Sequence, residues 1–293
     1  MHPQLYINVA TSAAHIALVA VGFAIVYQIG RCFHFAHAAV YTVGAYAAFT
    51  ASNHIAMSPW FSLCVGVGAG ALLGGIIELC VYMHLRRTRA NSLIFMLASL
   101  GILVVVQNAI SAICGDETRS LPSAAGFARS CDLWGGRVTG AQLALILLCI
   151  FMMVVWAVVQ AKTKLGVAIR AVSNDEDLSR VMGVKVTFTV LAAVLFGSAL
   201  AGSAGVLWGY NSAIHPRMGF TALLLGIVAA LVGGVESVSG VLLGSILLAC
   251  VQQVAMWKFP TQWQDVPVFI LLILFLLFRP QGVLGKSVRS VSV

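Results

Sequence analysis

Long apolar segments recur along the whole chain, separated by short polar connections. An α-helix needs about 20 mainly apolar residues to cross the hydrocarbon core of a bilayer. Segments near this length predict nine candidate membrane spans, at 8–29, 36–54, 60–85, 91–113, 141–160, 188–209, 219–234, 240–257 and 266–279. The chain is therefore expected to be an all-α, polytopic transmembrane helical bundle.

Three of the nine segments differ from simple spans. Segments 219–234 and 266–279 are short, so each is expected to be tilted, extended or partly re-entrant. Residues 33–49, "FHFAHAAVYTVGAYAAF", are rich in small and polar residues, which favours a broken or half-buried helix. The prediction is therefore eight or nine crossings.

A charged stretch interrupts the apolar pattern at 164–185, "KLGVAIRAVSNDEDLSRVMGVK". Its first half has apolar residues at helical spacing on one face. Ser173 followed by Glu176 fits a capping box, in which the serine side chain caps the helix and the glutamate reaches back to the serine N–H. Gly183 is a natural C-terminal stop. The stretch predicts two short amphipathic helices with an abrupt bend between them.

The second of these helices carries an apolar ridge of Leu178, Val181 and Met182. One interpretation is a helix that lies on the membrane surface. However, the helix begins with three acidic residues (175–177), which anionic lipids repel. Docking to a soluble partner, with the helix in a groove, is therefore the favoured interpretation.

The composition supports a membrane protein and limits what the charge can mean. Hydrophobic residues make up 60% of the chain and charged residues only 9%, whereas soluble domains are about 25% charged. The formal net charge is +8, but Lys and Arg gather on the cytoplasmic side of membrane proteins. The positive charge is therefore no sign of nucleic-acid binding.

Three basic clusters predict the orientation in the membrane. The clusters are Arg86, Arg87 and Arg89; Lys162, Lys164, Arg170, Arg180 and Lys185; and Arg279, Lys286 and Arg289. All three face the cytoplasm by the positive-inside rule, which agrees with the even number of spans between successive clusters. The N-terminus is then outside and the C-terminus cytoplasmic. Loop 114–140 is external and segment 161–187 is cytoplasmic, within a single membrane domain, 1–293.

Two of the cysteines, Cys114 and Cys131, flank the predicted external loop. An oxidising periplasm would permit a disulfide between them. The alternative is two free thiols that never meet, because the sequence does not give the separation of their Cα atoms.

Polar residues inside the predicted spans are functional candidates, namely His15, Glu78, Gln107, Asn108, Glu236, Gln252 and Gln253. Glu78 is expected to pair with a basic neighbour, and Gln107 and Asn108 to hydrogen-bond across helices. His34 and His37 have the spacing of two metal ligands, but the sequence offers no further ligand nearby, so no metal is expected. Nucleotide-binding, HExxH and GxSxG motifs are missing from the sequence. Neither a catalytic activity nor a cofactor is expected, and any ATP would be bound by another chain.

The charged stretch "GVAIRAVSNDEDLSRVMGVKV" resembles the coupling segment of ABC-importer permeases of the branched-chain amino acid (Liv-type) family. Three further motifs resemble the same family: "GRCFHFAHAAVYTVGAYAAF", "HPRMGFTALLLGIVAALVGGVESVSG" and "RPQGVLGK". The order and spacing of these motifs hold over nearly the whole chain, so the resemblance is specific.

The chain departs from the family pattern at a few positions. His34 and Ala38 stand where the family has Asn and Gly, and Glu236 stands at the second glycine of a GGxGS motif. Leu225 occupies the place of a residue that is often basic. These changes bear on the substrate more than on the family, because related permeases of the same build serve urea, short amides or other small solutes.

The resemblance implies a permease subunit of an ATP-driven importer of branched-chain amino acids in the bacterial inner membrane. The implied partners are a sister permease subunit, two cytoplasmic ATP-binding subunits, a periplasmic substrate-binding protein and the lipid bilayer. Residues expected to couple to the ATPases are Arg170, Ser173, Asp175, Glu176, Leu178, Arg180, Val181, Met182 and Gly183. Residues expected near the translocation path are His34, His37, Gly233, Gly234 and Glu236.

Other classes of protein fit the sequence less well. A stand-alone secondary transporter would need inverted repeats and intramembrane acids for ion coupling, and only Glu78 and Glu236 are candidates. A membrane enzyme would need clustered His, Asp or Glu at membrane depth, which the sequence lacks. Ribose-type sugar permeases are a nearer alternative within the same class.

Overall fold

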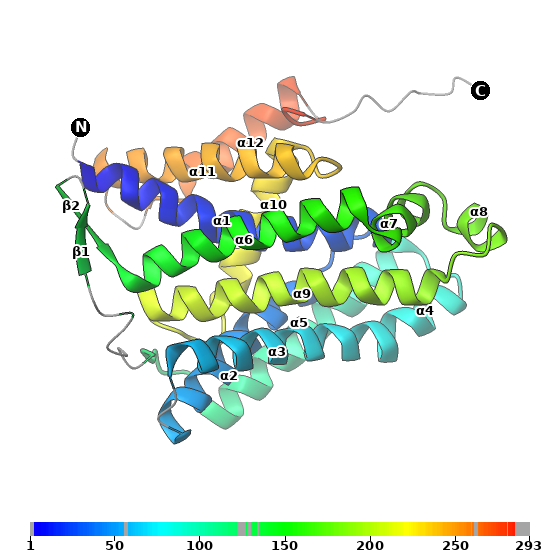
Figure 1. Ribbon diagram of the computed structural model, residues 1–293, viewed down its shortest axis with the longest axis horizontal. Helices are drawn as coiled ribbons and strands as arrows, with labels where there is room; N and C mark the ends of the chain where they lie inside the picture. The colour runs from blue at the N-terminus through cyan, green and yellow to red at the C-terminus, as the bar shows by residue number, and fades with distance from the viewer. Residues whose placement is uncertain are drawn as a thin grey trace.

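Each of the nine predicted segments is helical in the computed structural model of the chain (Figure 1). The structure describes residues 3–55, 58–121, 127, 130–133, 135–258, 260, 263–279 and 281–284. The helices are α1 (Pro3–Gly30), α2 (Ala36–Ile55), α3 (Pro59–Ile77), α4 (Met83–Arg87), α5 (Ser92–Cys114), α6 (Gly140–Lys162), α7 (Lys164–Asn174), α8 (Glu176–Val181), α9 (Val186–Asn211), α10 (Met218–Gly233), α11 (Val238–Lys258) and α12 (Val266–Phe278). A π-helical turn, Glu78–Tyr82, joins α3 to α4. Lys286 and Arg289 of the third basic cluster lie outside the described residues.

Within the described part of the chain, six helical segments are long and apolar enough to cross a membrane. They are α1, the continuous helix Pro59–Arg87, α5, α6, α9 and α11, while α10 and α12 are shorter apolar helices. The chain is therefore a mainly helical, multi-pass membrane protein. Of the two alternatives for 33–49, a broken or a half-buried helix, the break is wrong, because α2 runs without interruption for 20 residues after a non-helical turn.

Small residues explain why α2 remains a regular helix. Gly44 on α2 lies against the backbone of Gly202 on α9, so close that an added Cβ would lie 2.7 Å from the Gly202 Cα. A Cβ on Gly70 of α3 would lie 3.0 Å from the same Cα, so α2, α3 and α9 meet at this point. Close backbone approach of this kind lets helices pack tightly in lipid. The small residues that suggested a broken helix are therefore packing residues.

The two non-membrane parts of the chain lie at opposite ends of the bundle (Figure 1). Helices α7 and α8 form one end. At the other end, β1 (Ser130–Leu133) pairs antiparallel with β2 (Gly136–Thr139). The side chain of Gln4 at the start of α1 hydrogen-bonds to both the N–H (2.9 Å) and the carbonyl (3.2 Å) of Arg137. The N-terminus and the hairpin therefore share one end.

The hairpin departs from the predicted all-α fold. Gly135 has φ of +83°, and Gly136 follows it at the turn. A glycine with positive φ is typical of a two-residue hairpin turn, so Gly135 in "WGGR" could have indicated this hairpin in the sequence. Cys131 lies on β1 and Cys114 ends α5, and both are free thiols. Of the two alternatives, a disulfide or two free thiols, the structure has the free thiols.

Candidate functional site

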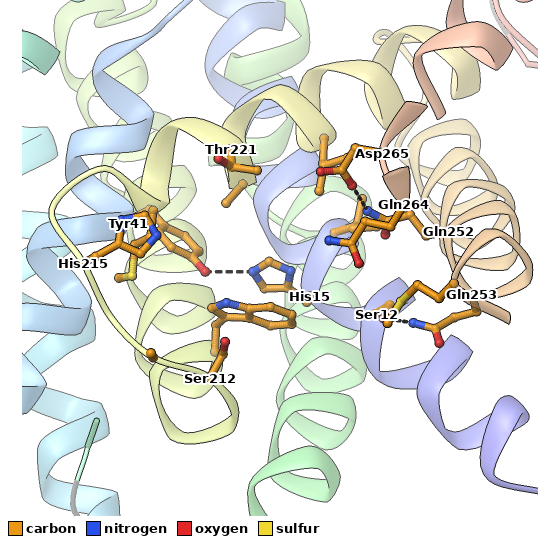
Figure 2. Close-up of a pocket in the computed structure, with 17 residues that line it drawn as sticks. Ser12, His15, Tyr41, Ser212, His215, Thr221, Gln252, Gln253, Gln264 and Asp265 are labelled. Atoms are coloured by element: carbon orange, nitrogen blue, oxygen red, sulfur yellow. Dashed lines mark hydrogen bonds between the residues drawn. The ribbon is translucent and has the colours of Figure 1, made fainter. Parts of the chain in front are cut away.

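A polar cavity lies at the hairpin end of the bundle (Figure 2). Helix α9 begins just after α8 and runs 26 residues, about 39 Å at 1.5 Å per residue, so its last residue is at the opposite end from α8. The end of α9, the start of α10, the end of α11 and the start of α12 meet here against α1 and α2. Together they enclose about 520 Å³, a volume typical of small-molecule sites.

One wall of the cavity is aromatic. His15 on α1 is 5% exposed, and its Nε2 lies 2.9 Å from the Tyr41 hydroxyl oxygen on α2. The indole of Trp208 stacks on the His15 ring, with 4.2 Å between ring centroids. His15 is therefore held in one orientation by a hydrogen bond and a stacked ring.

The opposite wall carries amides and a carboxylate. Gln252 Nε2 on α11 donates to Asp265 Oδ1 at 2.7 Å, and Gln253 Nε2 donates to Ser12 Oγ on α1 at 3.0 Å. Asp265 occupies the N-cap position of α12, but its side chain makes no capping hydrogen bond. Its carboxylate is held by Gln252 and lines the cavity.

The sequence had singled out only part of this cavity. His15, Gln252 and Gln253 were candidates because polar residues are costly inside a membrane span. Asp265 lies just ahead of an apolar segment, where a carboxylate is unremarkable in a sequence. Trp208 looks like any apolar residue of a span. Only the tertiary structure brings these five residues together.

The predicted path residues lie elsewhere. The His34 side chain is buried, with its Nδ1 2.7 Å from the Tyr82 hydroxyl oxygen, and His37 is buried against Gly22 of α1. Gly233 ends α10, whereas Met218 at its start lines the cavity. These two residues are about 22 Å apart along the helix. The structure therefore does not bring the predicted path residues into the cavity.

Two pairing predictions have different outcomes. Glu78 is buried and forms an ion pair with Arg86, as expected. Asn108 does not bond across helices, because its amide donates to the Val104 carbonyl of its own helix at 2.8 Å. Among the described residues, no group of three or more His, Cys, Asp or Glu side chains comes together as a metal site would require.

Helix α7 is braced against the bundle at the other end of the molecule. Thr163 caps it, with its hydroxyl oxygen accepting from the Gly166 N–H at 3.1 Å. Arg170 donates to the Gln160 side-chain oxygen at 3.2 Å, and also to the Gln160 carbonyl. Ile169 is buried in the bundle core. The apolar face of α7 is therefore an attachment to the rest of the bundle.

Helix α8 is capped differently from the prediction. Asp175, not Ser173, is the N-cap: its Oδ1 accepts from the Leu178 N–H at 2.9 Å. The predicted capping box is wrong because α7 continues through Asn174 and includes Ser173, whose hydroxyl donates back to the Arg170 carbonyl. A carboxylate at the N-cap serves the same purpose as a serine hydroxyl. The two predicted helices and the bend between them are confirmed.

The end of α8 agrees with the prediction. Gly183 has φ of +83°, a conformation that glycine adopts at little cost. Its N–H donates to the Arg180 carbonyl at 3.1 Å, and the Val184 N–H donates to the Ser179 carbonyl at 3.0 Å. This pair of bonds is a Schellman motif. Gly183 therefore ends the helix, as expected.

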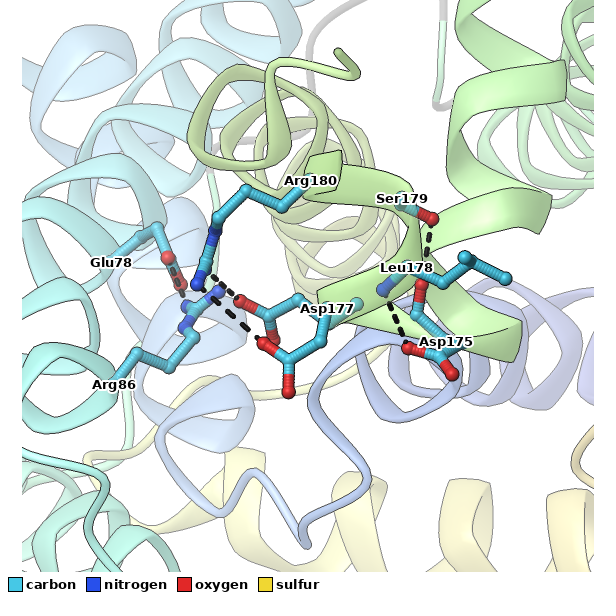
Figure 3. A network of polar contacts seen from close by, with 8 residues as sticks. Glu78, Arg86, Asp175, Asp177, Leu178, Ser179 and Arg180 are labelled. Carbon is cyan, nitrogen blue, oxygen red and sulfur yellow. Dashed lines mark hydrogen bonds and ion pairs between the residues drawn. The ribbon is translucent and has the colours of Figure 1, made fainter. Parts of the chain in front are cut away.

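The apolar ridge of α8 points away from the bundle. Leu178, Val181 and Met182 are 58%, 83% and 76% exposed. Glu176 and Asp177 pair with Arg180 at 2.8 and 3.7 Å on another side of the helix, which faces Glu78 and Arg86 (Figure 3). Exposed ion pairs of this kind add little stability, so the ridge is the main feature available for contact.

Arg31 links α7 to the turn between α10 and α11. Its guanidinium donates to the Ser173 carbonyl at the end of α7 (2.8 Å) and lies 3.8 Å from a carboxylate oxygen of Glu236. Gln28 on α1 donates to the Val235 carbonyl at 3.0 Å. Arg31 therefore contacts both the end of α7 and this turn, with its side chain largely exposed.

The C-terminal motif closes the end of α10. The N–H groups of Val283 and Leu284 donate to the carbonyls of Val232 and Gly233, at 2.8 and 3.1 Å. The last carbonyls of a helix have no hydrogen-bond donor within the helix, and the C-terminal segment supplies donors for two of them. The end of α10 is therefore held between α11 and the C-terminal segment.

The sequence matches the family model described as branched-chain amino acid transport system / permease component, over residues 5–276. The chain belongs to this family. It is 30% identical to the high-affinity branched-chain amino acid transport system permease protein BraD of Pseudomonas aeruginosa, over 97% of this chain and 95% of BraD. It is 28% identical to the permease protein LivH of Escherichia coli K12, with the same coverage.

A more distant relative of this Liv-type permease is named for a different substrate. The L-arabinose ABC transporter permease protein AraH of Azospirillum brasilense is 26% identical, over 82% of this chain and 70% of AraH. Identity is thus higher, and coverage more complete, with the permeases named for branched-chain amino acids.

Proposed function

We propose that this Liv-type permease is a membrane subunit of an ATP-driven importer of branched-chain amino acids. The observation that carries the proposal is the exposed ridge of α8, presented on a helix that is braced by α7. A solvent-exposed apolar ridge at helical spacing fits a groove on a partner protein. In this proposal Leu178, Val181 and Met182 are the anchors. Asp175 and Gly183 set the ends of α8, and Arg170 holds α7 in place.

The proposal includes the subunits implied by the family. A sister permease completes the membrane part, one of two cytoplasmic ATP-binding subunits docks on α8, and a periplasmic substrate-binding protein delivers the substrate. The whole chain acts as one membrane domain in the bacterial inner membrane. Gly233, Gly234 and Glu236 form a cytoplasmic turn that responds to α7 through Arg31, while His34 and His37 have a packing role.

The chain, purified from the membranes of its host under mild conditions, is expected to bring with it two ATP-binding subunits and a second permease. The complex should hydrolyse ATP, because hydrolysis is what the docked partners supply. Mass spectrometry of the purified complex and a phosphate-release assay check this. Recovery of the chain alone, folded and without ATPase activity, would contradict the proposal.

The proposed orientation puts the hairpin outside and α8 in the cytoplasm. A variant whose only cysteine is Cys131, which is exposed on β1, is expected to react with a membrane-impermeant maleimide added to intact cells after the outer membrane is made permeable. A matched variant whose only cysteine comes from Val167→Cys, at an exposed position of α7 away from the ridge, should react only after lysis. The opposite labelling pattern would show that the hairpin is cytoplasmic and α8 external, which would contradict the proposed orientation.

A further inference from the structure

The cavity at the hairpin end has an unusual balance of groups. Its lining combines amides, hydroxyls and two histidines with apolar side chains, in addition to Asp265. Of the described residues that line it, Asp265 alone is an Asp, Glu, Lys or Arg. No ion pair of Asp265 is found within the described part of the chain. A partly buried carboxylate without a cation attracts a positive group strongly, because the surroundings screen charge less than water does.

The position of Asp265 also fits a ligand rather than a structural role. Asp265 is the N-cap residue of α12, but its side chain makes no capping hydrogen bond to the helix backbone. Instead Gln252, which is 8% exposed, donates one N–H to Asp265 Oδ1 and fixes the carboxylate at the cavity wall. A carboxylate positioned by a buried amide is a preorganised acceptor for a further donor.

The remaining lining suits an aliphatic group. Ile16, Leu225, Met218 and Met256 contribute apolar surface from three helices. Methionine side chains adapt to branched shapes. The stacked Trp208 adds a flat apolar face.

We infer that this cavity is a substrate site that binds the ammonium group of an α-amino acid at Asp265 and its aliphatic side chain among the apolar residues. The inference rests on the proposed function and adds to it the atoms that recognise the substrate. The permease then selects for a primary amine itself, in addition to any selection by the binding protein. Neutral solutes of similar size, such as urea or acetamide, lack the positive group and bind poorly.

The test is direct binding of radiolabelled L-leucine to the purified complex in detergent, without nucleotide and without the binding protein. Asp265→Asn keeps the shape and a hydrogen-bonding oxygen but removes the charge. It is expected to weaken binding about 10- to 100-fold, the range typical for loss of a charged hydrogen-bond partner. The matched control is Asp132→Asn on β1, at the same end of the molecule but 80% exposed and outside the cavity. It should bind leucine like the native complex.

Competition separates the two ends of the substrate. With the native complex, 3-methylbutylamine, which keeps the ammonium, should displace leucine, and 4-methylpentanoate, which keeps only the carboxylate, should not. In the Asp265→Asn variant, 3-methylbutylamine should no longer compete with leucine better than 4-methylpentanoate does. Equal binding by Asp265→Asn, better competition by 4-methylpentanoate or urea, or no leucine binding to a native complex that hydrolyses ATP would each overturn the inference. That last result would leave the proposed coupling intact, because ATP hydrolysis is measured on the same preparation.

Discussion

Replacing Leu178 and Val181 together with aspartate is expected to leave the permease in the membrane and to abolish its association with the ATP-binding subunits. Both side chains are exposed and lie on the outer face of α8, so neither supports the fold. Burying an apolar anchor is worth about 1.5–3 kcal/mol, and loss of two anchors should weaken docking at least a hundredfold. Co-purification and ATP-driven uptake measure the effect.

The matched control for this double variant is Val167→Asp. Val167 lies on α7 and is 58% exposed, as Leu178 is. An aspartate at this position adds a charge near α8 without changing the ridge. Docking and uptake should remain close to native values. If the double variant still associates with its ATPases and transports at the native rate, α8 is a membrane-surface helix instead.

Replacing Gly233 with valine is expected to stop uptake while the subunits stay assembled. A Cβ at Gly233 would lie 2.8 Å from the Val241 Cα and would press on the Gly240 carbonyl. These are backbone atoms of α11, so they cannot move aside as a side chain could. At the adjacent Gly234, which has φ of +102°, a separate change to valine would strain the backbone by about 1–3 kcal/mol.

The expected effect follows from what this turn contacts. Arg31 and Gln28 attach it to α7 and α1, so a displaced turn breaks the connection between the docking segment and α10. Uptake by reconstituted complexes measures the loss, and subunit co-purification shows that the complex remains. Gly101→Val on α5 is the control, because a Cβ there meets no atom within 4 Å. Normal uptake by Gly233→Val would show that this turn has no role in transport.

Much of the fold could be predicted because the lipid environment restricts the choices. Every long apolar segment had to satisfy its backbone hydrogen bonds internally, and helices do so. The bend and the two helices of the coupling segment followed from local periodicity and from Gly183. The N-cap of α8 did not, because Ser173 and Asp175 are both good caps. Which one serves depends on how far α7 continues.

The candidate site was less accessible to sequence reasoning. His15 and Gln252 were visible as polar residues at membrane depth, but Asp265 is separated from His15 by nearly the whole chain. Its role depends on the start of α12 packing beside the end of α11. The histidines at 34 and 37 drew attention by their spacing, yet both side chains are buried, His34 in the turn before α2 and His37 in the first turn of α2. Contacts between distant segments place Asp265 in the cavity and keep the two histidines out of it, and the sequence alone does not show such contacts.

The most direct test of the account is uptake of radiolabelled L-leucine by proteoliposomes that contain the purified complex, with the binding protein on the external side. ATP enclosed on the cytoplasmic side should drive accumulation above the external concentration, and a non-hydrolysable analogue should not. Sodium and proton gradients imposed without ATP should have no effect. Accumulation driven by an ion gradient without ATP, at the rate seen with ATP, would contradict ATP-driven import and indicate a secondary transporter.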